Sequence, residues 1–193
     1  MSNTFIIASN NAHKVSEIQL LIGSAFELKT LADIGFTEDI PETGDTLIAN
    51  ALIKARHIYE IYKQNCFADD SGLEIEALDG APGVYSARYA GEPVNHQKNN
   101  EKVLHALLGK PNRNACFRTV IALIFEGKEF IFEGKIDGKI TEQLSGSNGF
   151  GYDPIFKPNG YDQCFAEMSL SEKSQISHRG IAVAKLAAFI NNS

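Results

Sequence analysis

The sequence contains a pair of adjacent carboxylates, Asp69 and Asp70, between an apolar approach and the hydroxyl of Ser71. Carboxylates at the end of a buried strand can hold Mg²⁺, because this hard cation takes oxygen ligands and keeps several waters. The hydroxyl and the backbone N–H groups of the loop beside it can bind phosphate oxygens. The segment 69–72 is also an ordinary turn sequence. It gains weight because four other polar clusters suit the same ligand.

A second cluster follows a short apolar stretch at the point where a helical pattern begins, and it consists of Ser9, Asn10, Asn11, Ala12, His13 and Lys14. A helix N-terminus binds anions through its free N–H groups and its dipole. Lys14 adds a cation, which suits a polyphosphate. Taken alone, a capped turn with an exposed lysine is the better explanation. The Walker pattern is absent, so this is not a P-loop enzyme.

A third cluster pairs an acidic loop with a helix. Glu42 lies in the loop 42–46, and Asn50 and Lys54 follow four positions apart, so they share one helix face. Glu42 can approach the Asp69–Asp70 pair from this loop. A solvated loop acid explains Glu42 equally well, and the sequence alone leaves both readings open.

The last two clusters suit a flat base. Glycines in the segment 146–151 let the backbone approach a ligand closely, and Phe150 or Tyr152 can stack on a ring. The members of these clusters that we expect at the ligand are Phe150, Gly151, Tyr152, Asp153, Lys173, His178 and Arg179. Cationic and ring N–H groups are donors suited to a purine carbonyl or a phosphate. A glycine-rich turn with core aromatics is the alternative for the first of the two.

Hydrophobic spacing predicts an α/β chain in which these clusters lie at the ends of strands and helices. Strands are expected at 4–8, 26–30, 66–68 and 73–78, a hairpin at 115–125 and 129–136, and a further strand at 140–144. Helices are expected at 12–22, from a cap at Asp45 or Thr46 to about 64, at 95–108 and at 181–190. No linker or repeat divides residues 1–193, which predicts one mixed α/β domain, with two lobes.

Composition excludes several classes of protein. The chain has 193 residues, 44% of them hydrophobic, and a formal net charge of −6, which argues against binding of long nucleic acid. It contains no apolar run long enough for a membrane span, and its start does not resemble a signal peptide. The three cysteines are far apart and without metal spacing, so buried, reduced thiols are expected.

Taken in order, the clusters resemble the inosine triphosphate pyrophosphatase, or Ham1-like, family over about residues 5–189. The matching motifs are Ser9-x-Asn11-x-x-Lys14, Glu42-Thr43-Gly44, Asn50-Ala51, Lys54-Ala55, Ala68-Asp69-Asp70-Ser71-Gly72-Leu73, Gly83-x-Tyr85-Ser86-Ala87-Arg88, Gly149-Phe150-Gly151-Tyr152-Asp153-Pro154, Glu172-Lys173 and Ser177-His178-Arg179-Gly180. Together these motifs are highly specific, although no single one is.

The resemblance implies an elongated mixed β-sheet with flanking helices and two lobes around a nucleotide-binding cleft. It implies a cytoplasmic, homodimeric enzyme that hydrolyses ITP, dITP and XTP to the monophosphate and pyrophosphate, which keeps deaminated purines out of DNA and RNA. Mg²⁺ would be held by Glu42 and Asp70, with Asp69 nearby. Ser9, Asn11, Lys14, Ser71 and Lys54 would hold the triphosphate, and residues 150–153 with Lys173, His178 and Arg179 would surround the base and sugar.

The resemblance leaves three questions open. Many relatives have glycine where His13 stands, and its bulk and titratable ring lie beside the phosphates. Asp70 is the expected proton acceptor for the attacking water, yet a carboxylate on Mg²⁺ is a weak base, so a metal-activated water oriented by Asp70 is the simpler alternative. A nucleotide sensor without turnover and a pyrophosphatase for modified pyrimidine or methylated nucleotides are the competing functions.

Overall fold

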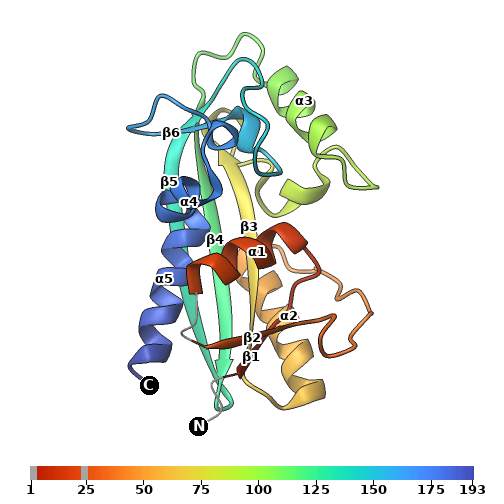
Figure 1. Ribbon diagram of the computed structural model, residues 1–193. Helices are drawn as coiled ribbons and strands as arrows, with labels where there is room; N and C mark the ends of the chain where they lie inside the picture. Colours follow the sequence, from red (N-terminus) through yellow and green to blue (C-terminus); the bar gives the residue numbers. More distant parts are fainter. Residues whose placement is uncertain (1–3, 23–25) are drawn as a thin grey trace. The chain divides into compact units, whose positions relative to one another are not determined.

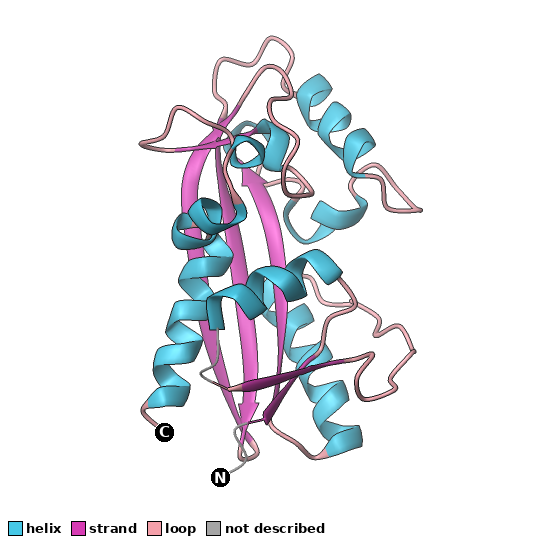
Figure 2. Cartoon of the chain, viewed as in Figure 1, coloured by secondary structure: helices cyan, strands magenta, loops and turns pink. Residues whose placement is uncertain are grey.

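The computed structural model describes residues 4–22 and 26–193, and its core is a six-stranded sheet in the order β2-β1-β3-β4-β5-β6. Its strands are β1 (Thr4–Ile7), β2 (Glu27–Thr30), β3 (Cys66–Ile75), β4 (Asn114–Phe125), β5 (Lys128–Ile140) and β6 (Phe156–Pro158). β1 is parallel to β2 and β3, whereas β5 and β6 are antiparallel, which confirms a mixed sheet. Figure 2 shows β3, β4 and β5 as its long strands.

Helices flank this sheet, as predicted. The α-helices of the described chain are α1 (Ala12–Ile22), α2 (Leu47–Tyr62), α3 (His96–Ala106), α4 (Leu170–Ile176) and α5 (His178–Asn191). Short 3-10 turns occupy η1 (Glu76–Leu78), η2 (Gly83–Arg88), η3 (Asp153–Ile155) and η4 (Phe165–Glu167). Of the two caps predicted for α2, Asp45 or Thr46, the structure shows Thr46, because its Oγ1 accepts a hydrogen bond from the N–H of Ala49 at 3.1 Å. No helix within the described ranges is long and apolar enough to cross a membrane.

The chain divides into two compact units, and β3, β4 and β5 contribute residues to both. Unit 1 comprises residues 1–70, 119–134 and 179–193, and unit 2 comprises 71–118 and 135–178. Each unit has its own apolar core.

In unit 1, alternation along β3 assigns neighbouring residues to opposite faces of the sheet. Phe67 belongs to a buried cluster with Ile18 of α1 and Leu186 of α5, and Figure 1 shows α1 crossing in front of β3 and β4. The Sγ–H of Cys66, on the other face, donates to the carbonyl of Ala55 in α2 at 3.3 Å. Helices α1 and α5 therefore cover the face of Phe67, and α2 covers the face of Cys66.

In unit 2, strand residues pack against α3 and two aromatic side chains of the C-terminal half. The buried members of this cluster include Leu73, Ile75, Val103, Leu107, Phe117, Phe156 and Phe165. The three cysteines, Cys66 in unit 1 and Cys116 and Cys164 in unit 2, are buried thiols, as predicted. Burial raises the pKa of Cys66 to about 12 and that of Cys116 to about 11, so both stay protonated at neutral pH.

Two predictions of strands were wrong, and one strand was missed. Residues 66–68 and 73–78 were expected to be separate strands around an acidic turn, but β3 runs through the acidic pair to Ile75 and η1 follows. The pair is tolerated inside a strand because each carboxylate finds a cationic partner, as described below. The strand expected at 140–144 is absent from the described chain, since Ile140 is the last residue of β5. β6 was not predicted.

The segment 169–180 was expected to be merely polar, but it contains α4 and the start of α5. Ser169 and Glu172 form a capping box, in which Oγ of Ser169 accepts from the N–H of Glu172 and the Glu172 side chain accepts from the N–H of Ser169. This signature was present in the sequence. It fixes the helix that carries Lys173.

Candidate active site

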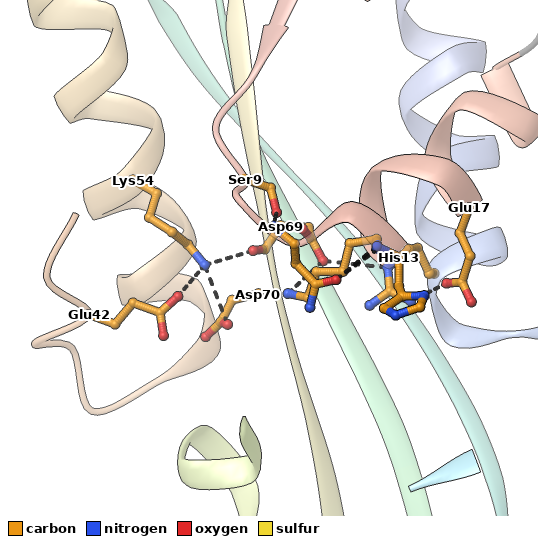
Figure 3. Close-up of polar contacts among 10 residues, drawn as sticks. Ser9, His13, Glu17, Glu42, Lys54, Asp69 and Asp70 are labelled. Carbon is orange, nitrogen blue, oxygen red and sulfur yellow. Dashed lines mark hydrogen bonds and ion pairs between the residues drawn. The ribbon is translucent and has the colours of Figure 1, made fainter. Parts of the chain in front are cut away.

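The two carboxylates of the acidic pair face opposite sides of the sheet, because Asp69 and Asp70 are consecutive residues of β3. Asp69 shares the face of Phe67, where Oδ2 lies 3.0 Å from Nζ of Lys14. Asp70 shares the face of Cys66, where Oδ1 lies 3.5 Å from Nζ of Lys54. Figure 3 shows the two carboxylates pointing to different partners. Each carboxylate is thus served by a lysine from a different helix.

The turn before α1 is held by its own side chains. Oδ1 of Asn11 accepts from the N–H of His13 at 3.0 Å and from that of Lys14 at 3.2 Å, and Oγ of Ser9 accepts from the N–H of Asn11. These backbone donors are therefore satisfied within the turn. Lys14 is the cation of the turn and is only partly exposed.

The acidic loop is fastened to α2. Oδ1 of Asn50 accepts from the N–H of Gly44 at 2.8 Å. Oε1 of Glu42 lies 2.5 Å from Nζ of Lys54, which also donates to the backbone carbonyl of Asp69 at 2.8 Å. A Cβ on Gly44 would lie 2.7 Å from Cβ of Ala49, so glycine is required for this close approach. Of the two readings of Glu42 that the sequence left open, the structure therefore shows the approach to the acidic pair, through Lys54.

Burial and charge act differently on the two aspartates. Burial opposes ionisation of Asp69, but Lys14, Arg179 and Lys54 outweigh it and hold the pKa of this carboxyl well below its usual range. Burial raises the pKa of Asp70 above 3.8, and Glu42 and Asp69 add to this rise, while Lys54 and Lys14 oppose it. Asp69 is therefore the permanently charged member of the pair, and Asp70 is the better proton acceptor.

The Asp70 side of the site fits a magnesium ion. Oδ2 of Asp70 is buried and has no hydrogen-bond partner among the residues that the structure describes, and Oδ1 shares Lys54 with Glu42. No group of three or more His, Cys, Asp or Glu side chains within the described ranges could itself hold a metal ion. Mg²⁺ needs fewer, since one or two carboxylates together with substrate phosphates and waters satisfy it.

In unit 2, a buried ion pair organises the glycine-rich loop. Nζ of Lys173 lies 2.6 Å from Oδ2 of Asp153, and both side chains are almost wholly buried. The same oxygen accepts from the N–H of Phe150 at 2.8 Å, and Nζ of Lys173 lies 5.0 Å from the centre of the Phe150 ring. Lys173 and Asp153 thus fix the position of an aromatic ring that is only half-buried.

Two further predicted residues of unit 2 are buried and held in place. The hydroxyl of Tyr152 donates to the carbonyl of Ser86 at 2.8 Å. The ring of His178 lies flat on that of Phe117, with centroids 4.5 Å apart and an interplanar angle of 10°. Ser71, the first residue of unit 2, lies half-buried in β3, and Gly151 accepts through its carbonyl from Nδ2 of Asn100 at 2.9 Å.

The predicted site residues fall into two sets. Unit 1 brings together the turn 9–14, Glu42, Lys54, Asp69 and Asp70, although Asn10, Ala12 and His13 are exposed. Arg179 belongs to this unit, apart from its neighbour His178, and pairs with Asp69 and Glu17. Glu17 was not predicted. Its only signal was its position one helical turn after Lys14.

Comparison with known proteins accounts for these clusters. The model of the Ham1 family matches residues 5–189. A dITP/XTP pyrophosphatase of Porphyromonas gingivalis is 55% identical over 186 residues, which are 96% of each chain. A dITP/XTP pyrophosphatase of Flavobacterium johnsoniae is 52% identical over 94% of each chain.

Solved structures agree with this assignment. A HAM1 protein from Coxiella burnetii superimposes with a TM-score of 0.91 at 39% identity, covering 100% of both chains. The Staphylococcus aureus Ham1 protein gives a TM-score of 0.90 at 38% identity, covering 98% of both chains. Family model, relatives and structures extend over nearly the whole sequence. The chain therefore belongs to the Ham1 family.

Proposed function

We propose that this protein is a pyrophosphatase for non-standard purine nucleoside triphosphates. It would hydrolyse ITP, dITP and XTP between the α and β phosphates, which releases the nucleoside monophosphate and pyrophosphate. The names of the relatives that are 55% and 52% identical over nearly the full chain support this substrate class. The observation that supports hydrolysis is the buried carboxylate of Asp70. It lies 3.5 Å from the ammonium of Lys54, which also pairs with Glu42.

The triphosphate would be bound by short polar side chains and two lysines. Lys14, which lies at the start of α1, supplies one charge, and Ser9, Asn11 and Ser71 supply hydrogen bonds. Lys54 supplies a second charge on the Asp70 side of β3. Because a triphosphate carries several negative charges close together, it needs such local cations although the protein as a whole is acidic.

Mg²⁺ would be held by Asp70 and Glu42, as the orphaned Asp70 oxygen supports. When bound, it neutralises charge on the phosphate oxygens and lowers the pKa of its water ligands. Asp70 would orient the attacking water, whose proton a bound metal makes easier to remove. Asp69 would stay ionised between Lys14 and Arg179, so its contribution is to hold cations and not to move a proton.

Selection of the base would depend on donors aimed at the oxygen on purine C6. Hypoxanthine and xanthine carry a carbonyl there, whereas adenine carries an amine and would leave buried donors unpaired. Lys173, held by Asp153, and the buried ring of His178 would supply such donors from unit 2. Phe150 and Tyr152 would supply aromatic surface for the base.

We further propose that the enzyme works in the cytoplasm as a homodimer and removes deaminated purine nucleotides before a polymerase incorporates them. The described helices include none that could cross a membrane. The net charge of −6 suits a free nucleotide substrate better than a nucleic acid chain.

The test is pyrophosphate release from ITP, dITP, XTP, GTP and ATP with Mg²⁺, for the wild type and for Asp70→Asn. We expect rapid release from ITP, dITP and XTP, weak release from GTP and ATP, and loss with EDTA or in the variant. Tight ITP binding without turnover would instead identify a sensor. Equal turnover of all five nucleotides would support pyrophosphate release by this enzyme but reject its selectivity for deaminated purine nucleotides.

A further inference from the structure

Four charged side chains of unit 1 form a continuous chain that ends at Lys14, in the first turn of α1. Glu17 on α1 accepts a short hydrogen bond from Nη1 of Arg179 at the start of α5. Nε of Arg179 lies 3.5 Å from Oδ2 of Asp69, and the same oxygen lies 3.0 Å from Nζ of Lys14. Figure 3 labels Glu17 and Asp69, the two acidic members of this chain.

Burial makes the members of this chain depend on one another. Glu17, Arg179 and Asp69 are 4%, 2% and 1% exposed, so water cannot replace a missing partner. The side chain of Lys14 is 16% exposed, so among these four residues it is the one that a ligand can contact. Charges in such a site hold each other in fixed positions more strongly than surface charges do.

One oxygen of Asp69 pairs with two cations, and the role that we infer for Glu17 depends on this shared oxygen. Oδ2 of Asp69 approaches both Lys14 and Arg179, so the two cations compete for it. Glu17 pairs with Nη1 of the same guanidinium, whose Nε lies 3.5 Å from Oδ2 of Asp69, farther than the 3.0 Å between that oxygen and Nζ of Lys14. With that carboxylate neutral, Arg179 would be drawn more strongly to Asp69, which would weaken the hold of the shared oxygen on Lys14.

We infer that Glu17 is a positioning residue that acts through Arg179 and Asp69 to fix the ammonium of Lys14 for a polyphosphate. The inference rests on the proposed function in one respect, which is that Lys14 contacts the phosphates. Glu17 itself touches no substrate in this scheme. Glu17 lies about one helical turn after Lys14 on α1, so both side chains are on the same side of this helix.

The experiment is a double-mutant cycle with inorganic tripolyphosphate as the probe, measured by calorimetry at fixed Mg²⁺. The proteins are the wild type, Glu17→Gln, Lys14→Met and the double variant. Glu129→Gln is the matched control, because Glu129 also pairs with an arginine of unit 1, Arg56, but at an exposed position. Urea denaturation of each variant reports stability separately.

We expect Glu17→Gln to weaken tripolyphosphate binding about tenfold in the Lys14 background and to have no further effect once Lys14 is Met, since the two residues act as one unit. Glu129→Gln should bind as the wild type does. Equal losses in both backgrounds, or no loss in either, would overturn the inference, because Glu17 would then act on the fold alone or not at all.

Two further outcomes separate this inference from the proposed function. If Lys14→Met binds tripolyphosphate normally, the phosphate role of Lys14 fails and the inference fails with it. If Lys14→Met binds weakly but Glu17→Gln does not, the inference alone fails. Should Glu17→Gln not fold, Glu17→Asp replaces it in the same cycle. Glu17→Asp keeps the charge but shortens the side chain by one methylene, so we expect a smaller loss of tripolyphosphate affinity.

Discussion

The ammonium of Lys54 lies 2.5 Å from a carboxylate oxygen of Glu42. It also lies 3.5 Å from Oδ1 of Asp70 and donates to the backbone carbonyl of Asp69. One cation thus joins the acidic loop to β3 on the face where the reaction is proposed. Burial opposes the charge of Lys54, but Asp70, Glu42 and Asp69 outweigh it and raise the pKa of this amine. Lys54 therefore stays charged throughout the neutral range.

Replacing Lys54 by Met should shift the acid limb of the pH profile upward. Lys54 lowers the pKa of Asp70, so its removal raises that pKa, and Asp70 then becomes a carboxylate only at higher pH. We expect kcat/KM for ITP at pH 7 to fall by at least about tenfold, with part of the loss recovered at higher pH. A profile from pH 5 to 9 measures this.

Arg56→Met is the control for this variant, because Arg56 lies on the same helix and pairs with Glu129 at the surface. It should leave the pH profile unchanged. An acid limb that stays in place in Lys54→Met would show that Asp70 is not the group that titrates.

Asp70→Asn should abolish most activity and at the same time stabilise the metal-free protein. Burial raises the pKa of Asp70 above its ordinary value of 3.8, so the folded state binds this proton more tightly than the unfolded state does. Ionised Asp70 therefore costs stability at pH 7, and the cost disappears below pH 3.8, where the carboxyl is protonated in both states. Turnover of ITP should fall by about 100-fold or more.

Urea denaturation in EDTA checks the second half of this prediction. The variant should have the higher midpoint at pH 7, and its advantage should shrink as the pH falls toward 3.8. Added Mg²⁺ should stabilise the wild type and not the variant, since only the wild type has both carboxylates. A variant less stable than the wild type at pH 7 would contradict the argument that the buried charge of Asp70 lowers the stability of the metal-free protein.

Lys173→Met should destabilise unit 2 and weaken recognition of the base. It leaves Asp153 buried without its cation, which costs about 3–5 kcal/mol for a buried pair that loses one partner. KM for ITP should rise, because Asp153 also holds the backbone of Phe150. The matched control is Lys135→Met, whose pair with Asp137 in the same unit is exposed and contributes about 0–1 kcal/mol. Equal losses of stability in the two variants would refute the argument.

The sequence was sufficient for those parts of the fold that depend on local pattern. The helix 12–22, the cap of α2 at Thr46 and the hairpin of β4 and β5 follow from spacing, capping and turn residues. The sequence allowed the approach of Glu42 to the acidic pair without deciding it, and it did not predict that Lys54 would lie between Glu42 and Asp70. In contrast, helix α4 was missed although its capping box was visible, because its composition is polar.

The electrostatic partners could not be predicted, because they are distant in the sequence. Arg179 was expected beside the base, and its pair with Glu17 joins residues 162 positions apart. The opposite orientation of Asp69 and Asp70 depends on β3 continuing through them, which local propensity disfavours. The tertiary placement of Lys14 and Lys54 on the two faces gives each of these buried carboxylates a cation.

Alanine substitutions at two glycines of the glycine-rich loop distinguish a steric clash from the cost of a left-handed backbone. Gly149 has φ +72°, and a Cβ there would lie 2.1 Å from Oδ2 of Asp153, the oxygen that holds Lys173 and Phe150. Gly151 has φ +63° and no atom within 4 Å of such a Cβ. Gly151→Ala should therefore cost only about 1–2 kcal/mol for the left-handed backbone. Gly149→Ala should cost more and raise KM for ITP, because it displaces Asp153. Stability and KM measured for both variants check this, and identical behaviour would mean that contact with Asp153 plays no part.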